Sequence, residues 1–202
     1  MAEISQSGPQ WSLSYASYTP KELEEITGLS TDMQRVWRRR GQLPAIRAGH
    51  ARFTPTEAVE IAIRYALSKV GLSPSESRIM ETHSIGGAIY HALRSADGTC
   101  EIVGPESSVA QFQKDFEDSE DLAMQLAGWP EATNYLILDD EDRLRVVDDA
   151  NDVFDWVGMT IVAVDLRVVG TRLVELGRKP LIAVTFPSIA GERTVRKLTG
   201  TI

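Results

Sequence analysis

Four arginines stand within six residues around a single tryptophan, in the stretch MQRVWRRRGQLP at residues 33–44. The guanidinium group presents a planar fork of donors that matches phosphate oxygens or the acceptor edge of guanine. A solvated helix face usually mixes such cations with acids, yet Asp32 is the only acid between residues 31 and 52. The residue types and their spacing therefore indicate a surface that binds a polyanion.

The charge of the chain is unevenly divided. Its net value is −8, which would argue against nucleic acid if it were spread evenly. Residues 1–80 carry 10 basic and 8 acidic side chains, whereas residues 81–202 carry 11 and 21. Because the halves differ this much, we interpret them as separate units, of which only the first suits a nucleic-acid partner.

Two short helices joined by a glycine turn are predicted to carry the arginines. Thr19 can cap the first helix, Pro20 fits its first turn, and Gly28 lies in the turn that follows. Ser30 or Thr31 can cap the second helix. This arrangement is typical of a helix-turn-helix.

The second helix is expected over residues 31–40, with one buried and one exposed face. Apolar side chains recur at helical spacing, which predicts that their face is buried. The members of this face are Met33, Val36 and Trp37, together with Arg40. The polar stripe opposite would then point outward. Its members are Thr31, Gln34, Arg35 and Arg38, with Arg39 beside them.

A small β-wing is predicted over residues 44–53. Leu43 and Ile46 would point inward, and the returning strand would hold Phe53. The rim of the wing would be basic, with Arg47, His50 and Arg52. A third helix is expected after Thr54 or Thr56, ending at Gly71.

Taken together, residues 18–78 resemble the winged helix-turn-helix of the MerR family of transcriptional regulators. They are also similar to the excisionase-type modules of phages and mobile elements. The matching features are the turn Gly28-Leu29-Ser30, Arg35 followed by Trp37, Gly41 with Leu43, the pair Arg52-Phe53, and a helix that ends in Gly71-Leu72-Ser73. MerR-type proteins commonly carry Leu at the position of Gln34 and an acid at that of Arg38, so this version is more polar and more basic.

The resemblance implies a bacterial or phage protein that binds double-stranded DNA. The second helix would enter the major groove and the wing would contact the flanking backbone. The residues expected to contact DNA are Thr19, Thr31, Gln34, Arg35, Arg38, Arg39, Arg47, His50 and Arg52. A homodimer is expected, because one recognition helix reads only a few base pairs. A transcriptional regulator that acts with RNA polymerase is the first hypothesis, and an excisionase-like accessory or architectural protein that recruits a recombinase is the alternative.

The predicted fold class is α+β, an N-terminal winged helix-turn-helix joined to a mixed α/β domain. Residues 1–17 are expected to be a flexible arm, 79–98 a helical connector, and 99–202 a domain for dimerisation or partner binding. Strands are indicated by runs rich in β-branched residues, with a hairpin around 139–142. These runs are CEIVG, NYLIL, RLRVV, MTIVAV and LIAVTF, and helices are expected over 107–128 and 165–177.

An enzyme is the third class of function considered. His83 and His91 lie two helical turns apart, too far to share a metal without help, and Cys100 has no neighbouring His or Lys. The acidic stretch 139–142 lacks the glycine and terminal glutamate of a calcium loop. We therefore expect no catalytic residue, no metal site and no cofactor.

The sequence also indicates a compartment. It shows no signal peptide at residues 1–14 and no stretch near the ~18 consecutive apolar residues that a membrane span needs. The single cysteine cannot form an internal disulfide. A cytoplasmic, nucleoid-associated protein without a membrane partner is expected.

Overall fold

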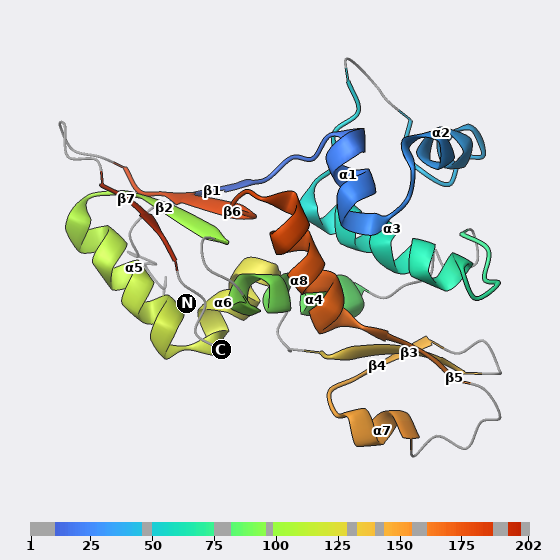
Figure 1. The fold of residues 1–202 in the computed structure, drawn as a ribbon. Coiled ribbons are helices and arrows are strands. Elements are labelled where there is room, and N and C mark those ends of the chain that lie inside the picture. Colours follow the sequence, from blue (N-terminus) through green and yellow to red (C-terminus); the bar gives the residue numbers. More distant parts are fainter. Residues whose placement is uncertain are drawn as a thin grey trace, which may run out of the picture.

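The structure is a computed structural model of the 202-residue chain. It describes residues 11–45, 50–74, 82–95, 99–128, 133–139, 144–154, 161–187 and 194–198. Helices and strands are mixed within these ranges, as the α+β prediction requires (Figure 1).

The first helix of the N-terminal module, α1 (Pro20–Thr27), begins where the sequence predicts. The Thr19 hydroxyl accepts a hydrogen bond of 3.2 Å from the Glu22 amide, and the Glu22 carboxylate accepts one of 2.7 Å from the Thr19 amide. This reciprocal capping box satisfies amides that the first turn leaves unpaired. Gly28 ends the helix at φ 79°, a left-handed conformation that favours glycine.

The second and third helices also begin at side-chain caps. Ser30 caps α2 (Thr31–Arg39) by accepting a hydrogen bond of 3.2 Å from the Met33 amide. Thr54 forms a capping box with Glu57 at the start of α3 (Pro55–Ser68). The three helices therefore begin at threonine or serine caps, and the predicted helix-turn-helix is confirmed.

The segment between α2 and α3 is held by two buried residues. Leu43 is buried as predicted, and Phe53 forms an isolated antiparallel bridge with Tyr18, through hydrogen bonds of 2.8 and 2.9 Å. The predicted wing strand at Phe53 thus pairs with the chain before α1. Residues 46–49, the other part of the expected wing, lie outside the described residues.

Outside this module, the described residues form two sheets and the helices that cover them. The first sheet has the order β1-β6-β2-β7, with β2 and β6 parallel and the outer pairs antiparallel. The second sheet is the antiparallel β4-β3-β5. The strands are β1 (Ser12–Tyr15), β2 (Cys100–Gly104), β3 (Tyr135–Asp139), β4 (Leu144–Val147), β5 (Ile161–Asp165), β6 (Ile182–Thr185) and β7 (Thr194–Lys197). The further helices are α4 (Thr82–Ser95), α5 (Glu106–Asp118), α6 (Glu120–Ala127), α7 (Ala150–Phe154) and α8 (Leu166–Gly177).

Helices α4 and α8 pack side by side between the two sheets (Figure 1). A Cβ atom on Gly170 of α8 would lie 2.5 Å from the carbonyl oxygen of Ala88 and 2.8 Å from the amide nitrogen of Ala92. Glycine at this position therefore permits a close contact between the helices. Because α8 also packs against α1 and α3, it joins the helix-turn-helix to the rest of the fold.

Three expectations about the organisation need correction. The arm expected over residues 1–17 is partly a strand, because Ser12–Tyr15 pair with β6; residues 1–10 lie outside the described part of the chain. The connector expected over 79–98 contains α4, whose Ala88 and Leu93 are fully buried, so α4 is core. The helix expected over 107–128 is interrupted at Ser119, which has an extended backbone and caps α6.

Candidate nucleic-acid interface

Two residues of α2 anchor that helix to the module. Trp37 is 5% exposed, and its ring meets the ring of Tyr65 edge-on at 6.3 Å between centroids. Gln34 is 1% exposed, and its side-chain amide donates hydrogen bonds of 2.9 Å to the carbonyl oxygens of Pro20 and Leu29. The buried face of α2 is therefore the one that holds Gln34 and Trp37.

This finding reverses part of the predicted assignment of faces, although Trp37 is buried as expected. Gln34 was expected to contact DNA, but it is buried, whereas Met33 was expected in the core and is 43% exposed. The reason is that a glutamine can be buried when backbone carbonyls accept its protons, which apolar spacing alone does not register. One feature did indicate that this position is buried, because MerR-type proteins commonly carry leucine there.

The exposed face of α2 is basic. Arg35 and Arg39 are exposed as predicted, and Arg40, which the sequence assigned to the buried face, is exposed as well. Asp32 is the single acid on the helix and lies 2.7 Å from Arg35. The two side chains are 72% and 86% exposed, so their ion pair is weak and Arg35 can exchange it for a phosphate.

Arg38 has a structural contact in addition to its charge. It is half-buried, its Nε donates a hydrogen bond of 3.1 Å to the carbonyl oxygen of Pro44, and its guanidinium lies 5.9 Å from the ring centroid of Phe53. Both partners belong to the segment predicted as the wing. Arg38 therefore positions this segment relative to α2.

A buried arginine that the sequence analysis did not single out supports the same region. Arg64 of α3 is 2% exposed, and its guanidinium lies 5.6 Å from the ring centroid of Trp37. It donates a hydrogen bond of 2.8 Å to the carbonyl oxygen of Gln42, and others of 2.8 and 3.2 Å to that of Pro74. It also pairs with Glu60 at 3.2 Å. Arg64 thus ties the ends of α2 and α3 together.

The other residues predicted to contact DNA differ in how far they are exposed. Thr19 and Thr31 are half-buried; the first caps α1, and the amide of the second donates to the Glu24 carboxylate at 3.4 Å. His50 and Arg52 are exposed beyond α2. Arg47 lies outside the described residues. The structure therefore brings the exposed arginines together on α2 and leaves two further basic side chains accessible after it.

The cysteine and histidine that were considered for catalysis or metal binding are at least partly buried. Cys100 is fully buried in β2, and this burial raises its pKa to about 12. His91 is half-buried, its Nε2 lies 3.1 Å from the carbonyl oxygen of Thr133, and burial lowers its pKa. No group of three or more metal-ligating side chains occurs among the residues described, and the acidic stretch at 140–143 is not among them.

The described residues thus include a helix-turn-helix, a motif typical of DNA-binding proteins, and its second helix exposes Arg35 and Arg39. Residues 18–83, about a third of the chain, match the family model described as MerR HTH family regulatory protein. A comparison with curated proteins finds no match. The MerR-like resemblance of the N-terminal part is thus confirmed, and in general terms the chain is a DNA-binding regulator of transcription. Within the described ranges, no helix has both the length and the apolar character needed to cross a membrane.

Proposed function

We propose that the chain binds double-stranded DNA sequence-specifically, with α2 in the major groove. The observation that carries this proposal is the exposed face of α2, where Arg35 and Arg39 lie opposite the buried Gln34 and Trp37. The C-cap residue Arg40 is exposed at the end of the helix. An α-helix fits the major groove, and arginine there can bind the O6 and N7 atoms of guanine with two hydrogen bonds.

Apolar side chains on the same face would add to the readout. Met33 is exposed and Val36 is half-exposed, and helical spacing places Val36 between Arg39 and Arg40 and Met33 beside Arg40. In the major groove such side chains contact the methyl group of thymine. The exposed face therefore combines groups that suit guanine with groups that suit thymine.

The segment after α2 would contact the flanking phosphates. His50 and Arg52 are exposed, and the bond from Arg38 to the carbonyl of Pro44 sets the direction in which this segment leaves α2. The sequence assigns Arg47 to the same rim. Contacts of this kind position a protein on the duplex without reading its sequence. The half-buried Thr19 and Thr31 would approach the backbone from the helix N-termini.

A homodimer is part of the proposal. One recognition helix reads only a few base pairs, and dimers place two such helices about one helical turn of DNA apart. Half-sites with this separation in the bound sequences would support a dimer. A single unrepeated half-site would contradict it.

The test is to incubate the purified protein with sheared DNA from its own source and to sequence what it retains. Enrichment upstream of genes is expected for the regulator, whereas a peak confined to an integration junction would support the excisionase-like alternative. The Arg39→Ala variant should lose about 1–3 kcal/mol of specific binding. Arg145→Ala, at the exposed position of β4, is the matched control and should bind as wild type does. No enrichment with wild-type protein would overturn the proposal.

A further inference from the structure

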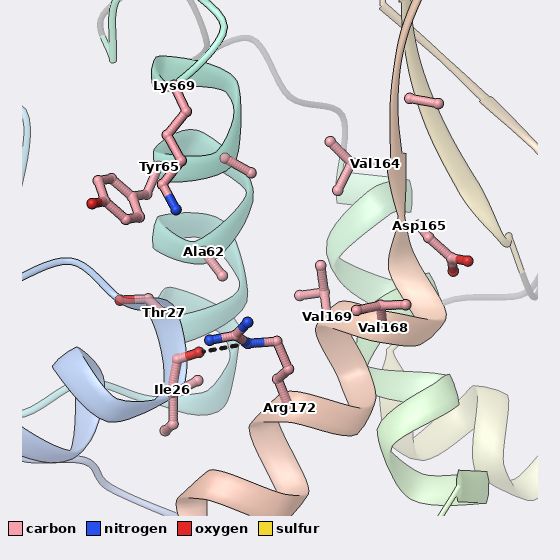
Figure 2. Close-up of a pocket in the computed structure, with 12 residues that line it drawn as sticks. Ile26, Thr27, Ala62, Tyr65, Lys69, Val164, Asp165, Val168, Val169 and Arg172 are labelled. Carbon is pink, nitrogen blue, oxygen red and sulfur yellow. Dashed lines mark hydrogen bonds between the residues drawn. The ribbon is translucent and has the colours of Figure 1, made fainter.

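A cleft of about 310 Å³ lies where the helix-turn-helix meets the rest of the fold (Figure 2). One wall is formed by the end of α1 and by α3, and the other by β5 and the first turns of α8. The volume is at the lower end of the range typical of small-molecule sites. The two walls come from parts of the chain more than 90 residues apart.

The lining of the cleft is mostly apolar. Ala62 and Ala66 on α3 face Val164, Val168 and Val169 across it. Val168 is 55% exposed, so part of the apolar lining is in contact with water. An apolar ligand body would therefore remove this surface from water, which is favourable.

The charged groups at the cleft favour an anion. Arg172 and Lys69 line it from opposite walls. Among the described residues that line the cleft, Asp165 is the single acid, and Figure 2 shows its carboxylate directed away from α3. Both of its oxygens accept hydrogen bonds from Arg167, at 3.0 and 2.7 Å. Its charge is therefore already balanced, and the lining is positive.

Arg172 is placed to bind such an anion. Its Nε donates a hydrogen bond of 3.2 Å to the carbonyl oxygen of Ile26, which holds the guanidinium at the end of the cleft (Figure 2). Within the part of the chain that the structure describes, its two terminal nitrogens donate to no protein acceptor. A guanidinium fixed at one nitrogen and open at the others is suited to a carboxylate.

We propose that this cleft binds a small amphipathic carboxylate. The carboxylate lies on the terminal nitrogens of Arg172, and a short apolar body lies between Ala62 and Val168. The cleft of about 310 Å³ is small, so a short straight-chain acid such as octanoate is a suitable probe.

The position of the site has a regulatory consequence, which rests on the proposed function. A bound ligand contacts both the helix-turn-helix and α8, so it changes the free energy of their association. By linkage, the factor by which the ligand changes the affinity for DNA equals the factor by which DNA changes the affinity for the ligand.

The first experiment measures binding to the protein alone, so it is independent of the DNA proposal. Octanoate is titrated into the full-length chain by calorimetry, and octylammonium, of the same length and opposite charge, is the control. We expect saturable binding of octanoate with a Kd of about 1 mM or tighter, and none of octylammonium. Absence of saturable octanoate binding, or equal binding of both probes, would overturn the proposal.

Three variants locate the site. Arg172→Met should weaken octanoate binding at least about tenfold, whereas Arg172→Lys should retain part of it because the charge remains. Ala62→Leu should exclude the ligand by filling the cleft. Lys197→Met, at an exposed position of β7, removes a charge elsewhere and should bind octanoate as wild type does. Thermal unfolding of each free variant identifies any that does not fold, and unchanged binding in folded Arg172→Met and Ala62→Leu would overturn the site.

The second experiment tests the regulatory consequence on a DNA fragment that the wild-type protein retains. Saturating octanoate should change the affinity for this fragment in wild type and leave that of Ala62→Leu unchanged. Equal DNA affinity with and without octanoate would overturn the coupling. A chain that binds octanoate and retains no DNA would overturn the proposed function and leave the cleft as a ligand site.

Discussion

The side-chain nitrogen of Gln34 lies 2.9 Å from the carbonyl oxygen of Pro20, the first residue of the preceding helix. This hydrogen bond, together with the one to Leu29, places a polar residue on the buried side of α2. The helix is thereby rotated so that Met33 and Arg40 face outward. The buried face of α2 is therefore held by Gln34 together with Trp37.

Replacement of Gln34 should affect stability more than DNA contacts. Gln34→Ala removes two hydrogen bonds and leaves a cavity, so we expect the free energy of unfolding to fall by about 2–4 kcal/mol. Gln34→Met keeps the volume and removes a buried oxygen that has no partner, so it should cost less. Urea unfolding of the two variants provides the measurement. A larger loss for Gln34→Met than for Gln34→Ala would contradict this account of the site.

Met33 and Trp37 should respond in opposite ways to truncation. Trp37→Ala removes a buried ring and should lower the free energy of unfolding by about 3–5 kcal/mol. Met33→Ala truncates an exposed side chain and should change it by less than about 0.5 kcal/mol. Thermal unfolding of both variants by circular dichroism tests this difference. Comparable destabilisation by Met33→Ala and Trp37→Ala would show that Met33 is buried, as the apolar spacing predicted.

Arg40 provides a test of the exposed arc, because the sequence alone put it in the core. If it contacts a phosphate, Arg40→Ala should weaken DNA binding uniformly across sequences and reduce the slope of log K against log salt by about 1. The measurement is DNA affinity at several salt concentrations, by fluorescence anisotropy. The free energy of unfolding should be unchanged. An unaltered salt slope would place Arg40 outside the interface.

The contact between Glu22 and Lys179 should make stability depend on pH. A hydrogen bond from the Lys179 ammonium, 2.5 Å from the carboxylate, together with the amide of Thr19, lowers the pKa of Glu22 from 4.5 to about 2. Because the pKa is lower in the folded state, the stabilisation is complete above about pH 4.5 and is lost as the pH falls towards 2.

The Glu22→Gln variant isolates this effect, since glutamine can keep the capping box with Thr19. We expect it to unfold at a lower temperature than wild type at pH 7, and the difference to shrink between pH 4.5 and 2. Calorimetry across this range measures it, and Lys179→Met should reproduce the trend. A difference that is independent of pH would show that the charge of Glu22 does not contribute.

Cys100 should react only when the chain unfolds. It is fully buried in β2, and burial raises its pKa from 9.0 to about 12. At pH 8 we expect a disulfide reagent to label the folded protein at least about a hundredfold more slowly than the urea-unfolded protein. The absorbance of the released thiolate follows the reaction. Equal rates in the two states would show that β2 opens readily.

Several features were determined by the sequence alone, because they depend on neighbouring residues. Threonine and serine caps define where α1, α2 and α3 begin, since they bond to amides two or three positions ahead. The order of helix, glycine turn and helix identified a MerR-like module, which the family match confirms. The strand runs after residue 99 were visible for the same reason, as β-branched residues mark a strand locally.

Other features depend on partners that are distant in the chain, and only the tertiary structure decided them. Ser12–Tyr15 become a strand because β6, about 170 residues later, offers an edge with which to pair. Gln34 is buried because Pro20 and Leu29 accept its protons. The cleft exists because α8 returns to contact α1, where Arg172 bonds to the carbonyl of Ile26 across 146 residues. Local spacing cannot report such contacts, because hydrogen bonds and close packing between remote segments form only when the whole chain has folded.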